Sequence, residues 1–202
     1  MSAPGTDTLA QLGLFIIKDF FDADFCSVLR AEARAVTNAP ATVVKKGFSV
    51  VEERTRKTKI AEVSAATVLS IEARLNALVP ELESHFDVKL TGCQTPQLLV
   101  YKKGDYFKAH QDNQSAHVPE YIRNRKVSAV VFLNSADRKP GADRYGGGSL
   151  IFYRLTDNPT ADNCRTPLTG EEGLLVAFRS STFHEVSPVI HGERYTVVSW
   201  FD

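Results

Sequence analysis

The part of the chain after Thr91 is a succession of short β-prone runs, and this pattern constrains the fold more than any other feature. Segments rich in β-branched and aromatic residues alternate there with turn residues. Strands this short and closely spaced are typical of a sandwich or jelly roll, not of a parallel α/β sheet. The expected strands are Gln97–Tyr101, Val127–Leu133, Ser149–Arg154, Leu174–Phe178 and Arg194–Phe201, with earlier ones at Leu14–Lys18 and Phe48–Glu52.

Two amphipathic helices are expected before these strands. The first spans about residues 22–36, with Asp22 or Asp24 available as N-cap. The second spans about residues 65–85 and repeats apolar residues at intervals of three and four. Pro80 falls inside this second pattern and should kink or interrupt the helix. We therefore expect a mainly β fold with flanking helices that buttress one sheet from outside.

The chain shows no repeat, low-complexity segment or flexible linker that would divide its 202 residues. We expect a single domain, in which residues 1–90 form a helical and β support region and residues 91–202 form the β core. The same pattern leaves open whether the first 90 residues contribute to dimerisation. Two loops, Gln114–Arg125 and Thr156–Gly173, are longer than usual, and such loops are often lids or binding loops.

Composition excludes several classes of protein. The 24 Lys and Arg balance the 24 Asp and Glu, so the chain lacks the basic field that sequence-independent nucleic-acid binding needs. No stretch approaches the roughly 18 apolar residues of a membrane span. The three cysteines are widely spaced without a CxxC pair, and the N-terminus does not resemble a secretory signal. We therefore expect a cytoplasmic protein with free thiols, no nucleic-acid partner and no membrane partner.

A possible metal site begins at His110 and Asp112. Side chains alternate faces in an extended segment, so these two side chains point the same way while Gln111 points the other way. His184, in another β-rich segment, can supply a third ligand from a neighbouring strand. Two histidines and one carboxylate leave the opposite positions of a metal open, an arrangement that suits non-haem Fe(II).

Arg194 strengthens this interpretation. It begins an otherwise apolar strand, and a charged side chain in such a strand is costly to bury without an anion. Its planar guanidinium fits a carboxylate through two parallel hydrogen bonds. The alternative is an internal salt bridge with an Asp or Glu.

Four blocks in this order resemble the Fe(II)- and 2-oxoglutarate-dependent dioxygenases, and within them the prolyl 4-hydroxylase branch. The resemblance covers about residues 97–202. The blocks are Gln97-Leu98-Leu99-Val100-Tyr101 followed by Tyr106 and His110-Gln111-Asp112-Asn113; Val131-Phe132-Leu133-Asn134; Gly147-Gly148-Ser149-Leu150-Ile151-Phe152; and His184-Glu185-Val186-Ser187-Pro188-Val189 followed by Arg194-Tyr195.

The resemblance implies a double-stranded β-helix, with Fe(II) held by His110, Asp112 and His184. It implies 2-oxoglutarate and O₂ as co-substrates, with ascorbate considered as a reductant. Arg194 would then hold the distal carboxylate of 2-oxoglutarate, Tyr101 would hydrogen-bond the co-substrate, and Trp200 would line its cavity.

One residue departs from the pattern of the branch. Similar hydroxylases have a tyrosine where this chain has Phe132, and that tyrosine shares the distal carboxylate with the arginine. Because phenylalanine has no hydroxyl group, Arg194 needs another helper. Ser128 and Thr196 are the candidates that we expect.

The implied reaction is hydroxylation of an unactivated C–H bond, with release of succinate and CO₂. A prolyl residue of a peptide or protein is the expected substrate; a free amino acid or other small molecule is the alternative, and a non-catalytic jelly-roll binding module is a third hypothesis. Residues 43–60 carry six basic against two acidic residues, and residues 101–126 six against three, which could steer an acidic partner.

Two further segments, Phe48–Lys59 and Asp137–Gly148, resemble the substrate-covering stretches of prolyl hydroxylases. We expect substrate contacts from Arg125, which precedes the Val127–Leu133 strand, and from Arg144, in the approach to the glycine-rich block.

Overall fold

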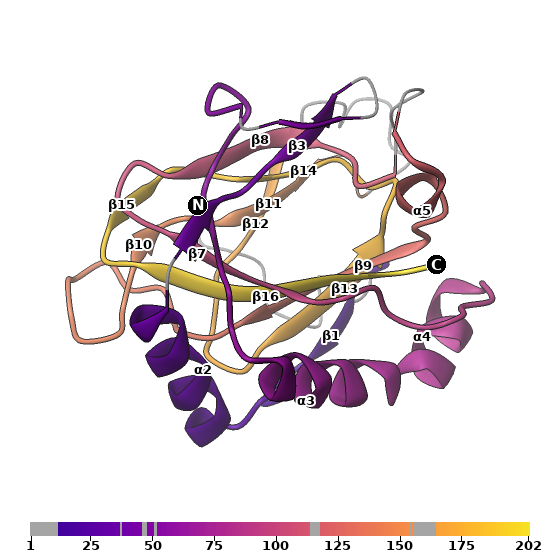
Figure 1. The fold of residues 1–202 in the computed structure, drawn as a ribbon, viewed down its shortest axis with the longest axis horizontal. Helices are drawn as coiled ribbons and strands as arrows, with labels where there is room; N and C mark the ends of the chain where they lie inside the picture. The colour runs from indigo at the N-terminus through magenta and orange to yellow at the C-terminus, as the bar shows by residue number, and fades with distance from the viewer. Residues whose placement is uncertain are drawn as a thin grey trace.

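The computed structural model describes residues 12–36, 38–45, 48–50, 52–113, 118–153, 155 and 165–202. Two antiparallel sheets form the body of the molecule, and helices lie along one of them (Figure 1). The expected mainly β fold with flanking helices is confirmed. Among the described residues, no helix has the length and apolar character needed to cross a bilayer.

The major sheet has seven strands in the order β1-β13-β9-β16-β7-β6-β2. Its central strands are long apolar runs because they are covered on both faces. Five of the seven strands, β1, β7, β9, β13 and β16, were expected within one residue at each end. The strands are β1 (Phe15–Ile17), β13 (Leu175–Arg179), β9 (Val127–Phe132), β16 (Arg194–Phe201), β7 (Gln97–Tyr101), β6 (Lys59–Ala61) and β2 (Asn38–Pro40).

The minor sheet has five strands in the order β12-β11-β14-β8-β5. It faces the major sheet across a shared apolar core, to which β7, β9 and β13 contribute from one side and β11 and β14 from the other. This is the expected jelly-roll arrangement. The strands are β12 (Arg165–Leu168), β11 (Leu150–Tyr153), β14 (His184–Val186), β8 (Tyr106–His110) and β5 (Arg56–Lys57). Two further two-stranded sheets pair β3 (Val43–Lys45) with β4 (Phe48–Val50) and β10 (Gly146–Gly147) with β15 (Val189–His191).

The long-loop predictions need correction where residues are described. The second half of the expected Thr156–Gly173 loop contains β12, which pairs with β11 despite Pro167. Within Gln114–Arg125, a short helix, α5 (Glu120–Arg123), begins directly after Pro119. Residues 114–117 and 156–164, and with them His117 and Cys164, lie outside the described residues.

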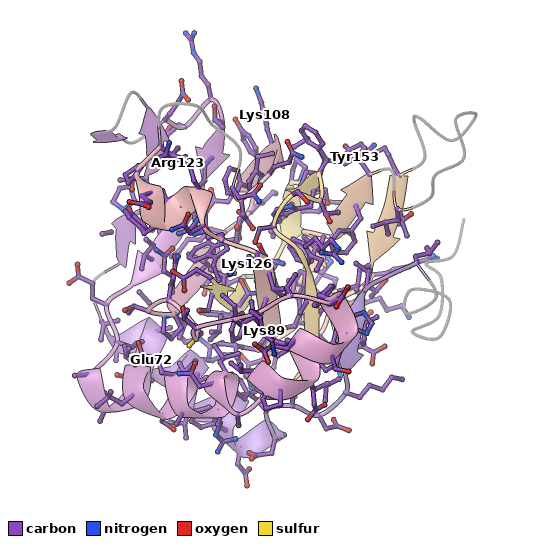
Figure 2. All side chains as sticks on the ribbon, turned by 90° about the vertical axis from the view of Figure 1, so that its right-hand side faces the viewer. Glu72, Lys89, Lys108, Arg123, Lys126 and Tyr153 are labelled. Atoms are coloured by element: carbon purple, nitrogen blue, oxygen red, sulfur yellow. The ribbon has the colours of Figure 1, made fainter. Side chains whose placement is uncertain are left out.

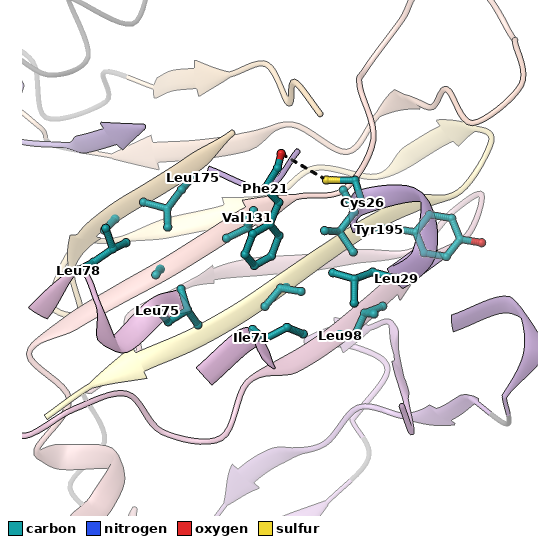
Figure 3. Packing of buried hydrophobic residues seen from close by; sticks show 14 of the residues in the cluster. Phe21, Cys26, Leu29, Ile71, Leu75, Leu78, Leu98, Val131, Leu175 and Tyr195 are labelled. Atoms are coloured by element: carbon teal, nitrogen blue, oxygen red, sulfur yellow. Dashed lines mark hydrogen bonds between the residues drawn. The ribbon is translucent and has the colours of Figure 1, made fainter. Parts of the chain in front are cut away.

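Helices α2 (Ala23–Ala35), α3 (Ala65–Asn76) and α4 (Val79–Phe86) cover the outer face of the major sheet (Figures 1, 2 and 3). Strand alternation explains the two cores: Leu98 and Val100 of β7 pack against the helices, whereas Leu99 and Tyr101 face the minor sheet. The helices contribute apolar side chains to the first of these cores, among them Cys26, Leu29, Ile71, Leu75, Leu78 and Leu82.

The helix boundaries follow from the local sequence. Helix α2 (Ala23–Ala35) begins at Asp22, whose carboxylate accepts the Phe25 backbone N–H at 2.7 Å. The second pattern forms two helices, α3 (Ala65–Asn76) and α4 (Val79–Phe86), so the expected interruption is confirmed. Pro80 stands in the first turn of α4, where its missing N–H would have no partner within the helix.

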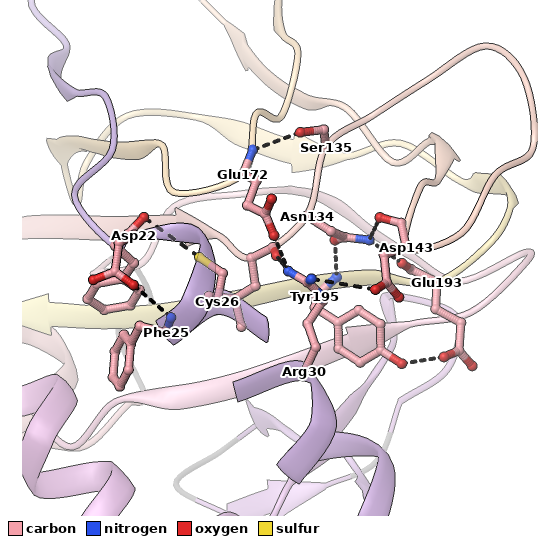
Figure 4. A network of polar contacts seen from close by, with 12 residues as sticks. Asp22, Phe25, Cys26, Arg30, Asn134, Ser135, Asp143, Glu172, Glu193 and Tyr195 are labelled. Carbon is pink, nitrogen blue, oxygen red and sulfur yellow. Dashed lines mark hydrogen bonds and ion pairs between the residues drawn. The ribbon is translucent and has the colours of Figure 1, made fainter. Parts of the chain in front are cut away.

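A buried polar network joins α2 to the ends of the sheet strands (Figure 4). Arg30 is 6% exposed and donates to the Leu133 carbonyl and to Glu172. Asn134 donates to the carbonyls of Asp143 and Glu193, at 3.0 and 2.9 Å. The support region is therefore fixed to the same end of β9 and β16 from which Arg194 enters the core.

Candidate metal centre and active-site pocket

The strand register of the minor sheet brings the three expected metal ligands together. His110 is the last residue of β8 and His184 the first of β14, and the two are direct partners in this antiparallel pair. Asp112 follows β8 by two residues, and its backbone N–H donates to the Ser180 carbonyl at 2.8 Å. Residues distant in the sequence therefore meet because two neighbouring strands pair.

The ligand atoms form a compact cluster. Asp112 Oδ1 lies 3.4 Å from His110 Nε2, and Asp112 Oδ2 lies 3.7 Å from His184 Nε2. One ligand atom from each residue lies within 4.8 Å of the others, a spacing that a single metal ion can bridge. Two imidazoles and one carboxylate are the donor set that suits Fe(II) with open coordination positions.

Both imidazoles are held in the tautomer that a metal ligand needs. The Nδ1 of His110 lies 2.8 Å from the Lys108 carbonyl, and the Nδ1 of His184 lies 2.9 Å from the Thr182 carbonyl. Since a carbonyl only accepts, each Nδ1 carries the hydrogen and each Nε2 presents a lone pair to the cluster. Phe107 stacks on the His110 ring at 3.6 Å, and Phe178 meets the His184 ring edge-on at 4.7 Å.

The electrostatics of the cluster also match metal binding. Burial and the neighbouring His110 lower the pKa of His184 to about 4, so its imidazole is neutral near pH 7. Burial alone would raise the pKa of Asp112, but His184, His110 and the Ser128 hydroxyl outweigh that effect and lower it. A neutral imidazole and an ionised carboxylate are the protonation states that bind a metal.

Ser128 and Ser180 orient the carboxylate. The Ser128 hydroxyl donates to Asp112 Oδ2 at 2.7 Å, and the Ser128 and Ser180 oxygens lie 2.9 Å apart. The sequence suggested Ser128 as a helper for Arg194, whereas the structure places it against Asp112. That prediction is wrong because the Ser128 hydroxyl is already used by the carboxylate.

The cluster lies in a cavity of about 360 Å³ between the two sheets. This volume is within the range of small-molecule sites. Tyr101, Arg125, Arg194 and Trp200 line the same cavity as the three ligands, so the structure brings these predicted residues together. It does not bring Arg144 there: that side chain is exposed in the loop before β10, and its neighbour Asp143 pairs with Arg30 and Arg34.

Arg194 forms a buried positive pole in this cavity. It is 1% exposed, and its guanidinium carbon lies 4.9 Å from the Tyr101 ring centroid and 5.0 Å from that of Phe132. Its Nη1 donates to Thr196 Oγ1 at 3.3 Å, while its Nε has no hydrogen-bond partner among the described residues. No described carboxylate lies within ion-pair distance of Arg194. The internal salt bridge considered for this residue is therefore absent from the described part of the chain.

A tyrosine that the sequence analysis did not single out stands beside this pole. Tyr145 is fully buried and its hydroxyl has no hydrogen-bond partner among the described residues. Burial raises the pKa of Tyr145, and the nearby Arg194 opposes that rise. A Cβ placed on Gly170 would lie 2.1 Å from the Tyr145 hydroxyl and 2.5 Å from the Phe132 ring, so the two rings meet at this glycine. The only available signal was its position just before the glycine-rich block.

Comparison with known proteins identifies the family. Residues 96–202 match the sequence profile of the 2OG-Fe(II) oxygenase superfamily, and the chain belongs to this superfamily. The cofactors of this class are Fe(II), 2-oxoglutarate and O₂, and the donor set of the cluster fits the iron. The unpaired Arg194 fits the carboxylate of the co-substrate. The double-stranded β-helix fold implied by the sequence is confirmed.

Individual relatives point to hydroxylases. The chain is 29% identical over 100 residues to a PKHD-type hydroxylase of Shewanella baltica and 33% identical over 101 residues to one of Synechococcus sp.. These matches cover about half of this chain and 39% and 37% of the relatives, so this chain matches well under half of their length.

Solved structures match over nearly the whole chain. A Pseudomonas putida prolyl-4-hydroxylase has a TM-score of 0.71 and 25% identity, over 96% of this chain and 95% of that one. A Trichoplax adhaerens prolyl hydroxylase, solved with a peptide fragment, has a TM-score of 0.69 and 21% identity, over 96% and 86% of the two chains. The second likeness shows the fold alone, and the first supports the prolyl hydroxylase-like branch.

Proposed function

We propose that this protein is a hydroxylase that acts on a prolyl residue of a peptide or protein. The observation that carries the proposal is one cavity in which a His-Asp-His cluster and a buried, unpaired Arg194 occur together. The likeness to a prolyl-4-hydroxylase over almost the full chain supports the prolyl substrate. We also propose that residues 1–202 fold as one domain, since support-region strands belong to both sheets.

In this proposal His110, Asp112 and His184 hold Fe(II) through two Nε2 atoms and one carboxylate oxygen. The backbone carbonyls behind the imidazoles and the Ser128 hydroxyl behind Asp112 fix these donors before the metal binds. When bound, the iron supplies O₂ activation driven by oxidative decarboxylation of 2-oxoglutarate. One oxygen atom enters succinate and the other enters the substrate as hydroxyl, so that R–H, O₂ and 2-oxoglutarate become R–OH, succinate and CO₂.

Arg194 binds the distal carboxylate of 2-oxoglutarate in the same proposal. Its guanidinium is buried between two rings, so a carboxylate there would be shielded from water and strongly held. The Thr196 hydroxyl accepts a hydrogen bond from Arg194, and Arg194 also acts on the Tyr145 hydroxyl, which takes the place of the one that Phe132 lacks. Tyr101 and Trp200 line the cavity walls, and Trp200 lies under Arg125.

The test begins with the metal-free protein prepared without oxygen. With Fe(II), 2-oxoglutarate and then O₂, we expect succinate to form, and we expect His110→Ala and Asp112→Ala to abolish it. Asp24→Asn is the matched control, because Asp24 is an exposed aspartate in the first turn of α2. Mass spectrometry of proline-containing peptides and of free amino acids should show one added oxygen atom in a peptide. Turnover that persists in both cluster variants contradicts the assignment of the metal ligands.

A further inference from the structure

Two more guanidinium groups face the cavity that holds the metal cluster. Arg56 begins β5, the edge strand of the minor sheet, and pairs in register with Phe107 of the neighbouring strand β8. Arg125 follows α5 and leads into β9. Both line the cavity, and neither has a carboxylate within ion-pair distance among the described residues. Arg56 was not distinguished in the sequence from the other basic residues of segment 43–60.

Arg56 is fixed in place although no described residue supplies a counter-ion to it. It is 9% exposed, and its guanidinium carbon lies 4.8 Å from the centroid of the Phe107 ring, whose other contact is the His110 imidazole. Its Nη1 donates to the Thr42 carbonyl at 3.1 Å, and its buried Nε has no partner in the described part of the chain. Burying a charge without an anion is costly, so such a group is expected to meet a ligand.

Arg125 is fixed in a similar way. Its guanidinium carbon lies 3.7 Å from the Trp200 ring centroid, a cation–π contact. Its Nε donates to Gln94 Oε1 at 2.9 Å, and its backbone carbonyl accepts from Asn113 at 3.1 Å. The other N–H donors of Arg125 have no hydrogen-bond partner among the described residues. A ligand can therefore bind them without rearrangement of the side chain, which keeps the entropy cost of binding low.

The charges of the cavity do not balance without an additional anion. Asp112 is the sole carboxylate among the described lining residues, against the three guanidinium groups of Arg56, Arg125 and Arg194. Bound Fe(II) and the dianion 2-oxoglutarate cancel each other. With Asp112 on the metal and Arg194 on the co-substrate, Arg56 and Arg125 keep their positive charges. Burial lowers the pKa of both arginines, and the charge of Asp112 opposes this in each of them. The charge of Arg56 further lowers the pKa of Arg125.

We infer that Arg56 and Arg125 bind a carboxylate that the substrate carries near the carbon to be hydroxylated. This inference rests on the proposed function and specifies its substrate as acidic. A planar carboxylate matches the donors of a guanidinium fork. The carboxylate comes either from an Asp or Glu side chain beside the target residue or from a free chain end, and both sources present the same group to the two arginines.

The experiment compares matched acidic and neutral probes on protein loaded with Mn(II) and N-oxalylglycine. Fluorescent peptides with proline flanked by Asp or Glu are set against the same peptides with Asn or Gln, and a peptide ending in proline against its amide. We expect the acidic probe to bind at least about tenfold more tightly than its neutral partner. Preference in the first set indicates a side-chain carboxylate, and preference in the second indicates a free chain end. No preference in either set overturns the inference.

Variants locate the effect. In Arg56→Gln and in Arg125→Gln we expect most of the preference for the acidic probe to disappear, whereas Arg56→Lys should keep part of it. Arg54→Gln is the matched control, because Arg54 is exposed two residues away and does not line the cavity. If the preference survives in both glutamine variants, the assignment to these arginines is wrong. The wild-type comparison stands even if a variant does not fold.

The outcome can be separated from that of the proposed function. Binding of Mn(II) and of 2-oxoglutarate, measured in the same variants, should remain within about twofold of wild type. Among the described residues, no hydrogen bond or ion pair joins either guanidinium to a metal ligand or to Arg194. If the wild-type protein forms succinate but does not prefer the acidic probe, the inference about Arg56 and Arg125 is refuted and the proposed function stands. Failure to bind the metal or the co-substrate refutes the proposed function.

Discussion

The Ser128→Ala substitution tests whether metal binding depends on the serine hydroxyl that donates a hydrogen bond to Asp112. Ser128 is 1% exposed on β9, and its hydroxyl donates to Asp112 Oδ2 at 2.7 Å. A hydrogen bond to a charged group contributes about 1.5–3 kcal/mol. Its loss leaves Asp112 less firmly ionised and free to rotate. We therefore expect the affinity for Mn(II) to fall roughly tenfold to a hundredfold, as for other residues that orient metal ligands.

Isothermal titration of the metal-free protein with Mn(II), without oxygen, measures this effect directly. Ser199→Ala is the matched control: Ser199 is also a buried serine of the major sheet, but its hydroxyl donates to the Gln94 carbonyl and not to Asp112. Thermal unfolding checks that both variants are folded. A Ser128→Ala protein that is folded and binds Mn(II) within twofold of wild type would refute the role given to this hydroxyl.

Three further predictions concern the cluster and the co-substrate pole. His184→Ala should remove measurable Mn(II) binding in a titration, and binding that persists would show that a different group completes the site. Tyr145→Phe should weaken 2-oxoglutarate binding to the Mn(II) protein roughly three- to tenfold, while Tyr153→Phe should not; equal affinities in the two variants would exclude Tyr145 from the pole. The metal-free protein should lose up to about 3 kcal/mol of stability as the pH falls from 6.5 to 4, because the unfolded chain protonates His184 before the folded one does. Urea unfolding at both pH values measures this loss, and a His184→Gln protein that keeps the same pH dependence would contradict it.

The strands were predictable where side-chain character alone decides the structure. β7 and β16 are long apolar runs, and both were expected with the bounds that the structure shows. Shorter strands were missed because they carry few apolar residues and exist only through pairing. β12 contains a proline and β5 has two residues, yet each is held by a neighbour in the minor sheet.

The candidate site was predictable in its side-chain ligands and not in its supporting groups. His110, Asp112, His184 and Arg194 belong to ordered motifs, so their meeting could be expected. The carbonyls of Lys108 and Thr182 that fix the imidazoles are backbone groups and leave no mark on the sequence. Arg56 could not be singled out either, because only the fold distinguishes a buried arginine from the exposed basic residues around it.

The cavity has walls from both halves of the chain. The superfamily profile begins at residue 96, whereas Thr42, Thr55 and Arg56 reach the cavity from the segment before it. The metal ligands and Arg194 thus lie inside the region that defines the superfamily, whereas Arg56, to which we assign substrate binding, lies outside it. Under that assignment, members that share only the profile region can use the same oxidant on different substrates. Exchanging the strands around Arg56 between two members tests this directly.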